Sequence, residues 1–144
     1  MSLESQTEVQ CPECNHTQVL TIWRSLNADI SPEARLDLLD GRVNFFQCER
    51  CDCQGLLPVP LLYHDMGRRF MVEYHPFEAL DDPEFLSNFD PSGESVAGAE
   101  TSRNAADGGF DYVARRHVVF HMGELVRYVV FRERLHDHHT DPGH

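Results

Sequence analysis

Apolar residues recur along the first half of the chain in short runs that are typical of β-strands. Three such runs lie at residues 17–23, 43–47 and 69–75. In the last of them Phe70, Val72 and Tyr74 fall on one side, which predicts a half-buried strand. A fourth apolar run, residues 56–63, is interrupted by two prolines. Because proline cannot donate a ladder hydrogen bond, we expect this run to form an edge strand or an extended segment.

A short helix is predicted between the first two strand-like runs. Ser31 is a favourable N-cap, and Pro32 suits the first helical position. Leu36 and Leu39 would provide its apolar side, with Ala34 and Leu38 close by, and Gly41 stands where a glycine commonly ends a helix. The first half of the chain therefore combines strands with one helix.

The second half contains a break followed by one strand and one helix. Residues 88–109 are rich in Gly, Ser, Ala, Asn and Asp without periodicity, which predicts a flexible acidic loop. Residues 112–120 are expected to be a strand that returns to the same sheet. Residues 123–135 are expected to be a helix with the apolar stripe Leu125, Val126, Val129 and Val130. Residues 137–144 indicate a polar, histidine-rich tail.

Two C-x-x-C pairs, Cys11/Cys14 and Cys48/Cys51, carry the clearest chemistry of the chain. Four thiolates are what a closed tetrahedral zinc site needs, so we predict one structural Zn²⁺ held by these residues. The segments around the two pairs align at an offset of 37 residues as a weak repeat, which indicates two similar knuckles facing one ion. The residue after each second cysteine is expected to favour a positive φ, and Asn15 and Asp52 tolerate that conformation.

Other uses of these cysteines stay open on the sequence alone. A rubredoxin-type iron centre uses the same four ligands. A redox motif of the thioredoxin type needs only one pair, and a disulfide role is a further alternative. His16 and Cys53 each follow the second cysteine of a pair by two residues, which makes them candidate spare ligands.

The charge balance narrows the classes of partner. The net charge is −12, and every basic residue is arginine. Such a negative field repels phosphate backbones, so nucleic-acid binding is disfavoured, whereas a basic protein partner would be attracted. No apolar stretch is long enough for a membrane span, and the first residues lack the pattern of a secretory signal. With an odd number of cysteines, this predicts a cytoplasmic protein.

The most enzyme-like segment is Tyr63-His64-Asp65, where a histidine next to a carboxylate could act as a general base. Adjacent residues of a strand point to opposite faces, however, so a structural role is favoured. His117 and His121 are four residues apart but fall in and just after a strand, so they are not expected to converge on one ligand. No catalytic residue is assigned.

Several segments together resemble the CpXC family. They are Cys11-Pro12-Glu13-Cys14, the helix from Ser31 to Gly41, Phe46-Gln47-Cys48, residues 61–65 with the following strand, and residues 118–126. The chain departs from the family pattern at Glu49, where the second motif would have proline. The resemblance implies metal-binding cysteines and brings no biochemical activity with it.

These observations predict an α+β protein. A zinc ribbon continues into a small antiparallel sheet, with one helix inserted between the cysteine pairs and one at the C-terminus. Residues 8–136 would form a single domain, composed of a front at 8–80, the loop at 88–109 and a C-terminal unit at 112–136. The favoured function is a non-catalytic protein-interaction or regulatory module. The alternatives are a small enzyme with a site near Tyr63, His64 and Asp65, with Cys53 as a further candidate, and a nucleic-acid-binding zinc ribbon.

Overall fold

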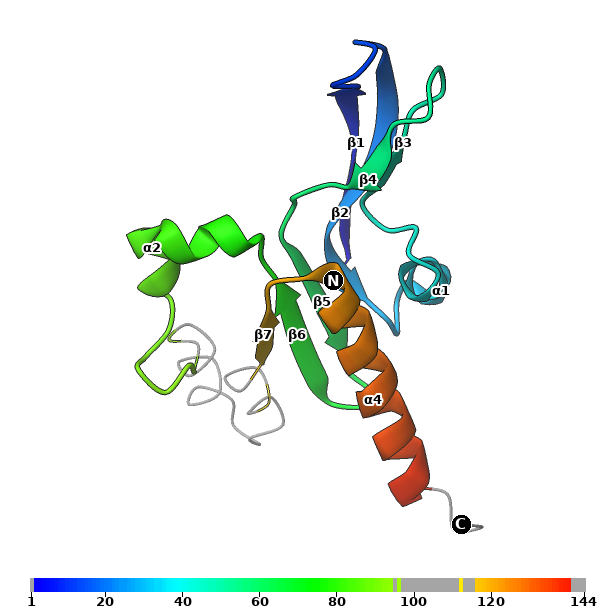
Figure 1. The fold of residues 1–144 in the computed structure, drawn as a ribbon. Helices are drawn as coiled ribbons and strands as arrows, with labels where there is room; N and C mark the ends of the chain where they lie inside the picture. The colour runs from blue at the N-terminus through cyan, green and yellow to red at the C-terminus, as the bar shows by residue number, and fades with distance from the viewer. Residues whose placement is uncertain (1, 95, 97–111, 113–115, 141–144) are drawn as a thin grey trace.

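Two β-sheets and a long C-terminal helix dominate the computed structural model (Figure 1), which describes residues 2–94, 96, 112 and 116–140. The strands are β1 (Leu3–Gln10), β2 (Thr17–Asn27), β3 (Phe45–Gln47), β4 (Gln54–Leu56), β5 (Leu61–Asp65), β6 (Phe70–Tyr74) and β7 (His117–Val119). The helices are α1 (Pro32–Leu39), the 3₁₀ helix η1 (Phe77–Asp81), α2 (Pro83–Leu86) and α4 (Met122–Thr140). The predicted α+β class, with one helix between the cysteine pairs and one at the C-terminus, is confirmed.

The main sheet has the order β1-β2-β5-β6-β7, and β3 and β4 form a separate two-stranded sheet. An antiparallel sheet was predicted, but the main sheet is mixed. Its strands β2 and β5 pair in parallel, and so do β6 and β7. Parallel neighbours need a long connection between them. Here α1 and the β3–β4 hairpin lie between β2 and β5 in the chain, and a long segment separates β6 from β7.

The two prolines lie outside the strands. Pro58 and Pro60 fall in the extended connection between β4 and β5. β5 begins after them and occupies the middle of the main sheet, so the prediction of an edge strand is wrong for this part of the run. β6 is also more enclosed than predicted, since all five of its residues are buried. Glu73 is buried there because its carboxylate binds Arg116 at 2.7 Å and His75 at 3.0 Å.

Helix α1 forms where predicted, but its cap and its buried side differ from the prediction. Ser31 makes no side-chain cap, because its hydroxyl donates to Ser2 Oγ at 2.9 Å. Ala34 and Leu38, four residues apart, face the core, whereas Leu36 is 56% exposed. Gly41 ends the helix as predicted, with a φ of +76° that favours glycine.

Helix α4 packs against β6 and β7 and closes the core with Leu125 and Val129, as the stripe predicted. The imidazole of His121 accepts a hydrogen bond from the Gly123 amide at 3.0 Å and so caps the start of this helix. The helix is longer than expected, because residues 137–140 continue it instead of beginning a tail. Residues 141–144 and most of the predicted loop at 88–109 lie outside the described residues. The strand predicted at 112–120 is present at residues 117–119, and residues 113–115 also lie outside the described part.

Across the described ranges, no helix has both the length and the apolar character that a bilayer span requires.

Candidate metal centre

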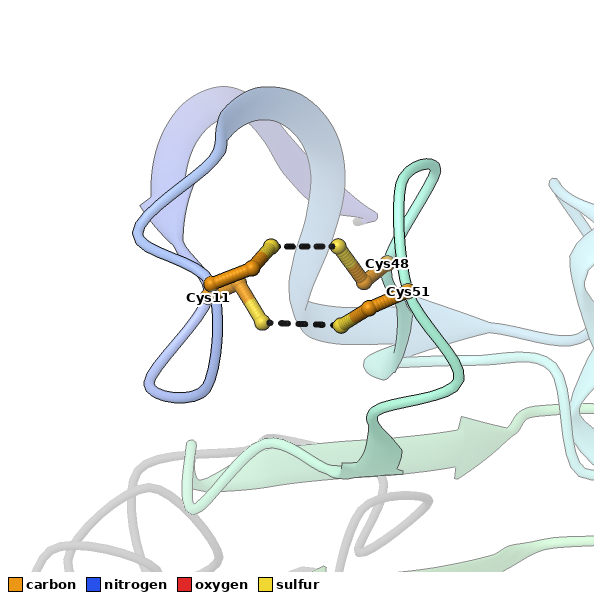
Figure 2. Close-up of side chains that lie close together, drawn as sticks. Cys11, Cys48 and Cys51 are labelled. Atoms are coloured by element: carbon orange, nitrogen blue, oxygen red, sulfur yellow. Dashed lines mark hydrogen bonds between the residues drawn. The ribbon is translucent and has the colours of Figure 1, made fainter.

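Two hairpins bring the four paired cysteines together. Cys11 and Cys14 lie in the turn between β1 and β2, and Cys48 and Cys51 lie in the turn between β3 and β4. Their Sγ atoms all lie within 4.8 Å of one another. Figure 2 shows the sulfurs of the first turn facing those of the second across a short gap. Residues 37 positions apart thus converge on one point.

The sulfur spacing fits a tetrahedral ion. Cys11 Sγ lies 3.6 Å from Cys51 Sγ, and Cys14 Sγ lies 3.5 Å from Cys48 Sγ. A tetrahedral ion with metal–sulfur bonds of about 2.3 Å sets its sulfurs roughly 3.8 Å apart. A disulfide would require about 2.05 Å, and all five cysteines are free thiols. The four cysteines therefore form a donor set that could hold a metal ion.

The repeat seen in the sequence is also a repeat of hydrogen bonds. The Cys11 amide donates to the His16 carbonyl at 2.8 Å, and the Cys48 amide donates to the Cys53 carbonyl at 2.9 Å. The amide of Glu13 donates to Cys11 Sγ at 3.4 Å. The amide of Arg50 donates to Cys48 Sγ at the same distance. Each turn thus directs backbone N–H groups at its sulfurs, which favours thiolates.

The prediction of positive φ holds for one turn only. Asn15 has φ of +65°, and its amide donates to the Cys11 carbonyl at 2.9 Å, which closes the first knuckle tightly. Asp52 does not adopt a positive φ. The second knuckle closes through the Cys48–Cys53 backbone bond without the additional tight turn.

Electrostatics make one thiol far more acidic than another. Burial raises the pKa of Cys11, but hydrogen bonds from the amides of Cys14 and Glu13 outweigh it and lower that pKa to about 6. For Cys51 the amide of Cys53 lowers the pKa, yet burial and the neighbouring thiols raise it to about 12. Ionisation of one thiol therefore opposes ionisation of the others. A divalent cation bound by the four sulfurs would remove this conflict by supplying positive charge at the centre.

A family model described as CpXC protein matches residues 9–140. The chain belongs to the CpXC family. The match spans both knuckles, the inserted helix α1 and helix α4, so the resemblance inferred from the sequence is confirmed. No curated protein and no solved structure matches this CpXC chain.

Two other candidate ligands of this CpXC protein lie outside the set of converging sulfurs. His16 Nε2 contacts Glu49 Oε2 at 3.3 Å, which links the first knuckle to the second from the side. Cys53 packs with the small apolar cluster around Phe46, and burial raises the pKa of its thiol. Among the described residues, the group of ligand atoms that converge contains neither of them.

Sequence reasoning missed two buried amide side chains that join the hairpins. Gln18 on β2 donates to the Gln47 carbonyl at 2.9 Å and accepts from the Glu49 amide at 3.0 Å. Asn44 accepts from the Trp23 amide and donates to the Trp23 carbonyl, both at 2.8 Å. Each amide thus replaces backbone pairing between β2 and the β3–β4 unit. No local signal in the sequence points to either contact, because the partners lie more than 20 residues away along the chain.

The Tyr63-His64-Asp65 segment does not converge. Tyr63 and Asp65 are buried on one face of β5, where Tyr63 stacks on Phe70 and Asp65 binds Arg68 at 3.1 Å. His64 lies on the opposite face and contacts the Tyr112 hydroxyl at 2.6 Å. Burial lowers the pKa of His64. The three side chains therefore do not share a cleft.

Proposed function

We propose that this CpXC protein is a zinc-stabilised module that binds protein and performs no catalysis. The observation that carries the proposal is the closed donor set of Cys11, Cys14, Cys48 and Cys51. Four thiolates satisfy a tetrahedral ion completely, so no position remains for a water or a substrate. Zn²⁺ would supply charge neutralisation and a cross-link between the hairpins. A reducing compartment such as the cytoplasm keeps these thiols available to the metal.

The β3–β4 hairpin depends on such a cross-link. Each of its strands has three residues, and an isolated hairpin of that size is not stable in water. Phe46 and Cys48 pack with Cys11 in a cluster separate from the main core. The metal would therefore hold the hairpin in position against β2 together with Gln18 and Asn44.

An apolar surface suited to protein binding extends from this hairpin to α4. Phe45 and Leu56 of the hairpin and Val126 of α4 line a hollow of about 280 Å³. The apolar surface continues along α4 from Val126 to Leu135. We call this surface the α4 groove and define it by Phe45, Leu56, Val126, Val130, Phe131 and Leu135. Phe131 is 57% exposed and Leu56 is 46% exposed, and exposed apolar side chains that form a continuous surface are typical of interaction sites.

The enzyme alternative has less support, because Tyr63, His64 and Asp65 diverge. Binding of nucleic acid conflicts with the net charge of −12.

Metal content and partner capture test the proposal separately. Purified chain should contain one zinc per molecule, and Cys48→Ser should lose it while the matched variant Cys53→Ser keeps it. Cobalt substitution should give the intense thiolate charge-transfer bands of a four-sulfur site. A protein that folds fully without metal would contradict the structural role.

For binding, tagged chain should capture a protein from its native cell, whether a different protein or untagged copies of itself. Phe131→Asp should abolish the capture. His64→Ala, on the far face of β5, should leave it intact. Capture that does not change with Phe131→Asp would contradict the role of the α4 groove.

A further inference from the structure

The segment after β6 forms an exposed amphipathic element that the metal centre does not use. In a 3₁₀ helix, residues three apart lie in one row. Phe77 and Leu80 of η1 form an apolar row and are 69% and 37% exposed. Glu78 and Asp81 form the neighbouring acidic row. In α2, Leu86 is 50% exposed and Glu84 adds a further carboxylate.

This exposed element is held firmly by other side chains. The Phe85 ring lies 4.5 Å from the His75 ring and 5.4 Å from the Phe89 ring. It also meets Phe120 edge-on at 6.3 Å, next to β7. Because Phe85 anchors the segment, the apolar residues on the outside are not needed to hold it in place. The η1–α2 segment therefore presents a preorganised acidic and apolar surface.

The α4 groove has the opposite charge at its edge. Arg127 and Arg134 flank Val130 and Phe131. Neither guanidinium has a carboxylate within ion-pair distance in the part of the chain that the structure describes. In a chain with a net charge of −12, two such arginines beside exposed apolar residues favour an acidic, apolar ligand.

The groove is not complementary to itself. If two α4 helices met antiparallel around Val130 and Phe131, Arg127 of one copy would face Arg134 of the other, and like charges would repel. The η1–α2 segment instead offers carboxylates next to apolar residues.

We propose that the α4 groove binds the η1–α2 segment of a second copy of this chain. The inference rests on the proposed function and names the partner of the same surface. Phe77, Leu80 and Leu86 cover the apolar residues of α4, while Glu78 and Asp81 pair with Arg127 and Arg134. Figure 1 places η1–α2 and α4 on opposite sides of β6 and β7, so the segment does not reach the groove of its own chain. Two such contacts, exchanged reciprocally, give a closed dimer.

Sedimentation equilibrium of the zinc-loaded full chain tests the inference. With rising concentration the mass should increase from 16.5 kDa towards twice that value. The charge reversal Arg127→Glu with Arg134→Glu should weaken dimerisation about tenfold or more. Glu78→Arg with Asp81→Arg should weaken it by a similar factor. This second pair makes the chain less acidic, so a mere effect of net charge would strengthen association instead.

Two further variants complete the test. Combining all four reversals in one chain restores the complementarity and should restore the dimer. Arg24→Glu changes net charge in the same direction as the α4 pair, away from the groove, and should leave the dimer unchanged. Circular dichroism and zinc content confirm that each variant is folded.

A wild-type chain that stays at 16.5 kDa at every concentration overturns the inference. So does a dimer that tolerates either charge reversal, or a folded four-fold variant that stays monomeric. If the chain is monomeric but Phe131→Asp still abolishes capture from the native cell, the groove binds a different protein. In that case the inference fails and the proposed function stands.

Discussion

Helices α1 and α4 are joined by a bidentate ion pair. Removing one of its two partners should destabilise the protein much more than removing the other. Arg35 Nε donates to Glu133 Oε2 at 2.6 Å, and Arg35 Nη2 donates to Glu133 Oε1 at 2.5 Å. The Glu133 side chain is 9% exposed, whereas that of Arg35 is 26% exposed. This pair raises the pKa of Arg35. The two partners therefore differ in how easily each can regain water.

Arg35→Ala should cost about 3–5 kcal/mol of unfolding free energy, because it leaves a buried carboxylate without a partner. Glu133→Ala should cost less, about 1–2 kcal/mol, since the remaining guanidinium can turn into solvent. The double variant removes both charges. It should therefore be no less stable than Arg35→Ala alone, which means that the two effects are not additive.

Urea unfolding at a fixed concentration of free zinc, followed by the fluorescence of Trp23, measures all four proteins. Arg24→Ala, at an exposed position of β2, should change stability by less than about 0.5 kcal/mol and serves as control. Equal costs for the two single variants, or simple additivity in the double variant, would refute this reasoning. Because the ion pair ties Glu133 of α4 to α1, Arg35→Ala should also increase hydrogen exchange in the C-terminal half of α4.

Three other outcomes follow from the structure. Gln18→Ala leaves the Gln47 carbonyl and the Glu49 amide unpaired and should lower the unfolding free energy by about 1–3 kcal/mol in the same urea assay. The control Gln6→Ala removes only an exposed side-chain bond to Thr21 and should change the unfolding free energy little. Leu125→Ala empties a fully buried site and should cost about 2–5 kcal/mol, while Leu36→Ala on the exposed side of α1 should be nearly neutral in thermal unfolding. Acidification should release the metal, because protons compete with it for the thiolates, and a chelating dye should record the loss as pH falls, with none at neutral pH.

The parts of the fold that could be predicted from the sequence are those with local signals. Two C-x-x-C turns identify the four cysteines that converge, because a knuckle needs only four neighbouring residues. Gly41 marks the end of α1 because few residues adopt its φ. The stripe of α4 follows from helical periodicity, and it identified Leu125 and Val129 as core residues.

Features that depend on distant residues could not be predicted in this way. The parallel pairing of β2 with β5 depends on where the chain returns after the β3–β4 hairpin. Prolines at 58 and 60 suggested an edge strand or an extended segment, and they lie in the connection that precedes the central strand β5. Gln18 looked like an ordinary strand residue, because its partners lie 29 and 31 positions further along. The burial of Glu73 requires its ion pair with Arg116, a residue far from it along the chain.

Strand β2 connects the cysteine-bearing hairpins to the main core. Residues 17–25 pair with β1 and lead to the first knuckle, and residues 25–27 pair with β5 in the core. Because side chains alternate along a strand, one extra residue within β2 would rotate the sulfur-bearing tip half a turn relative to the body. Insertions and deletions in related chains should therefore occur at residues 57–60, which lie outside the strands, so that no strand register is altered. The eleven residues of β2 therefore set the position of the first pair of cysteines relative to the core.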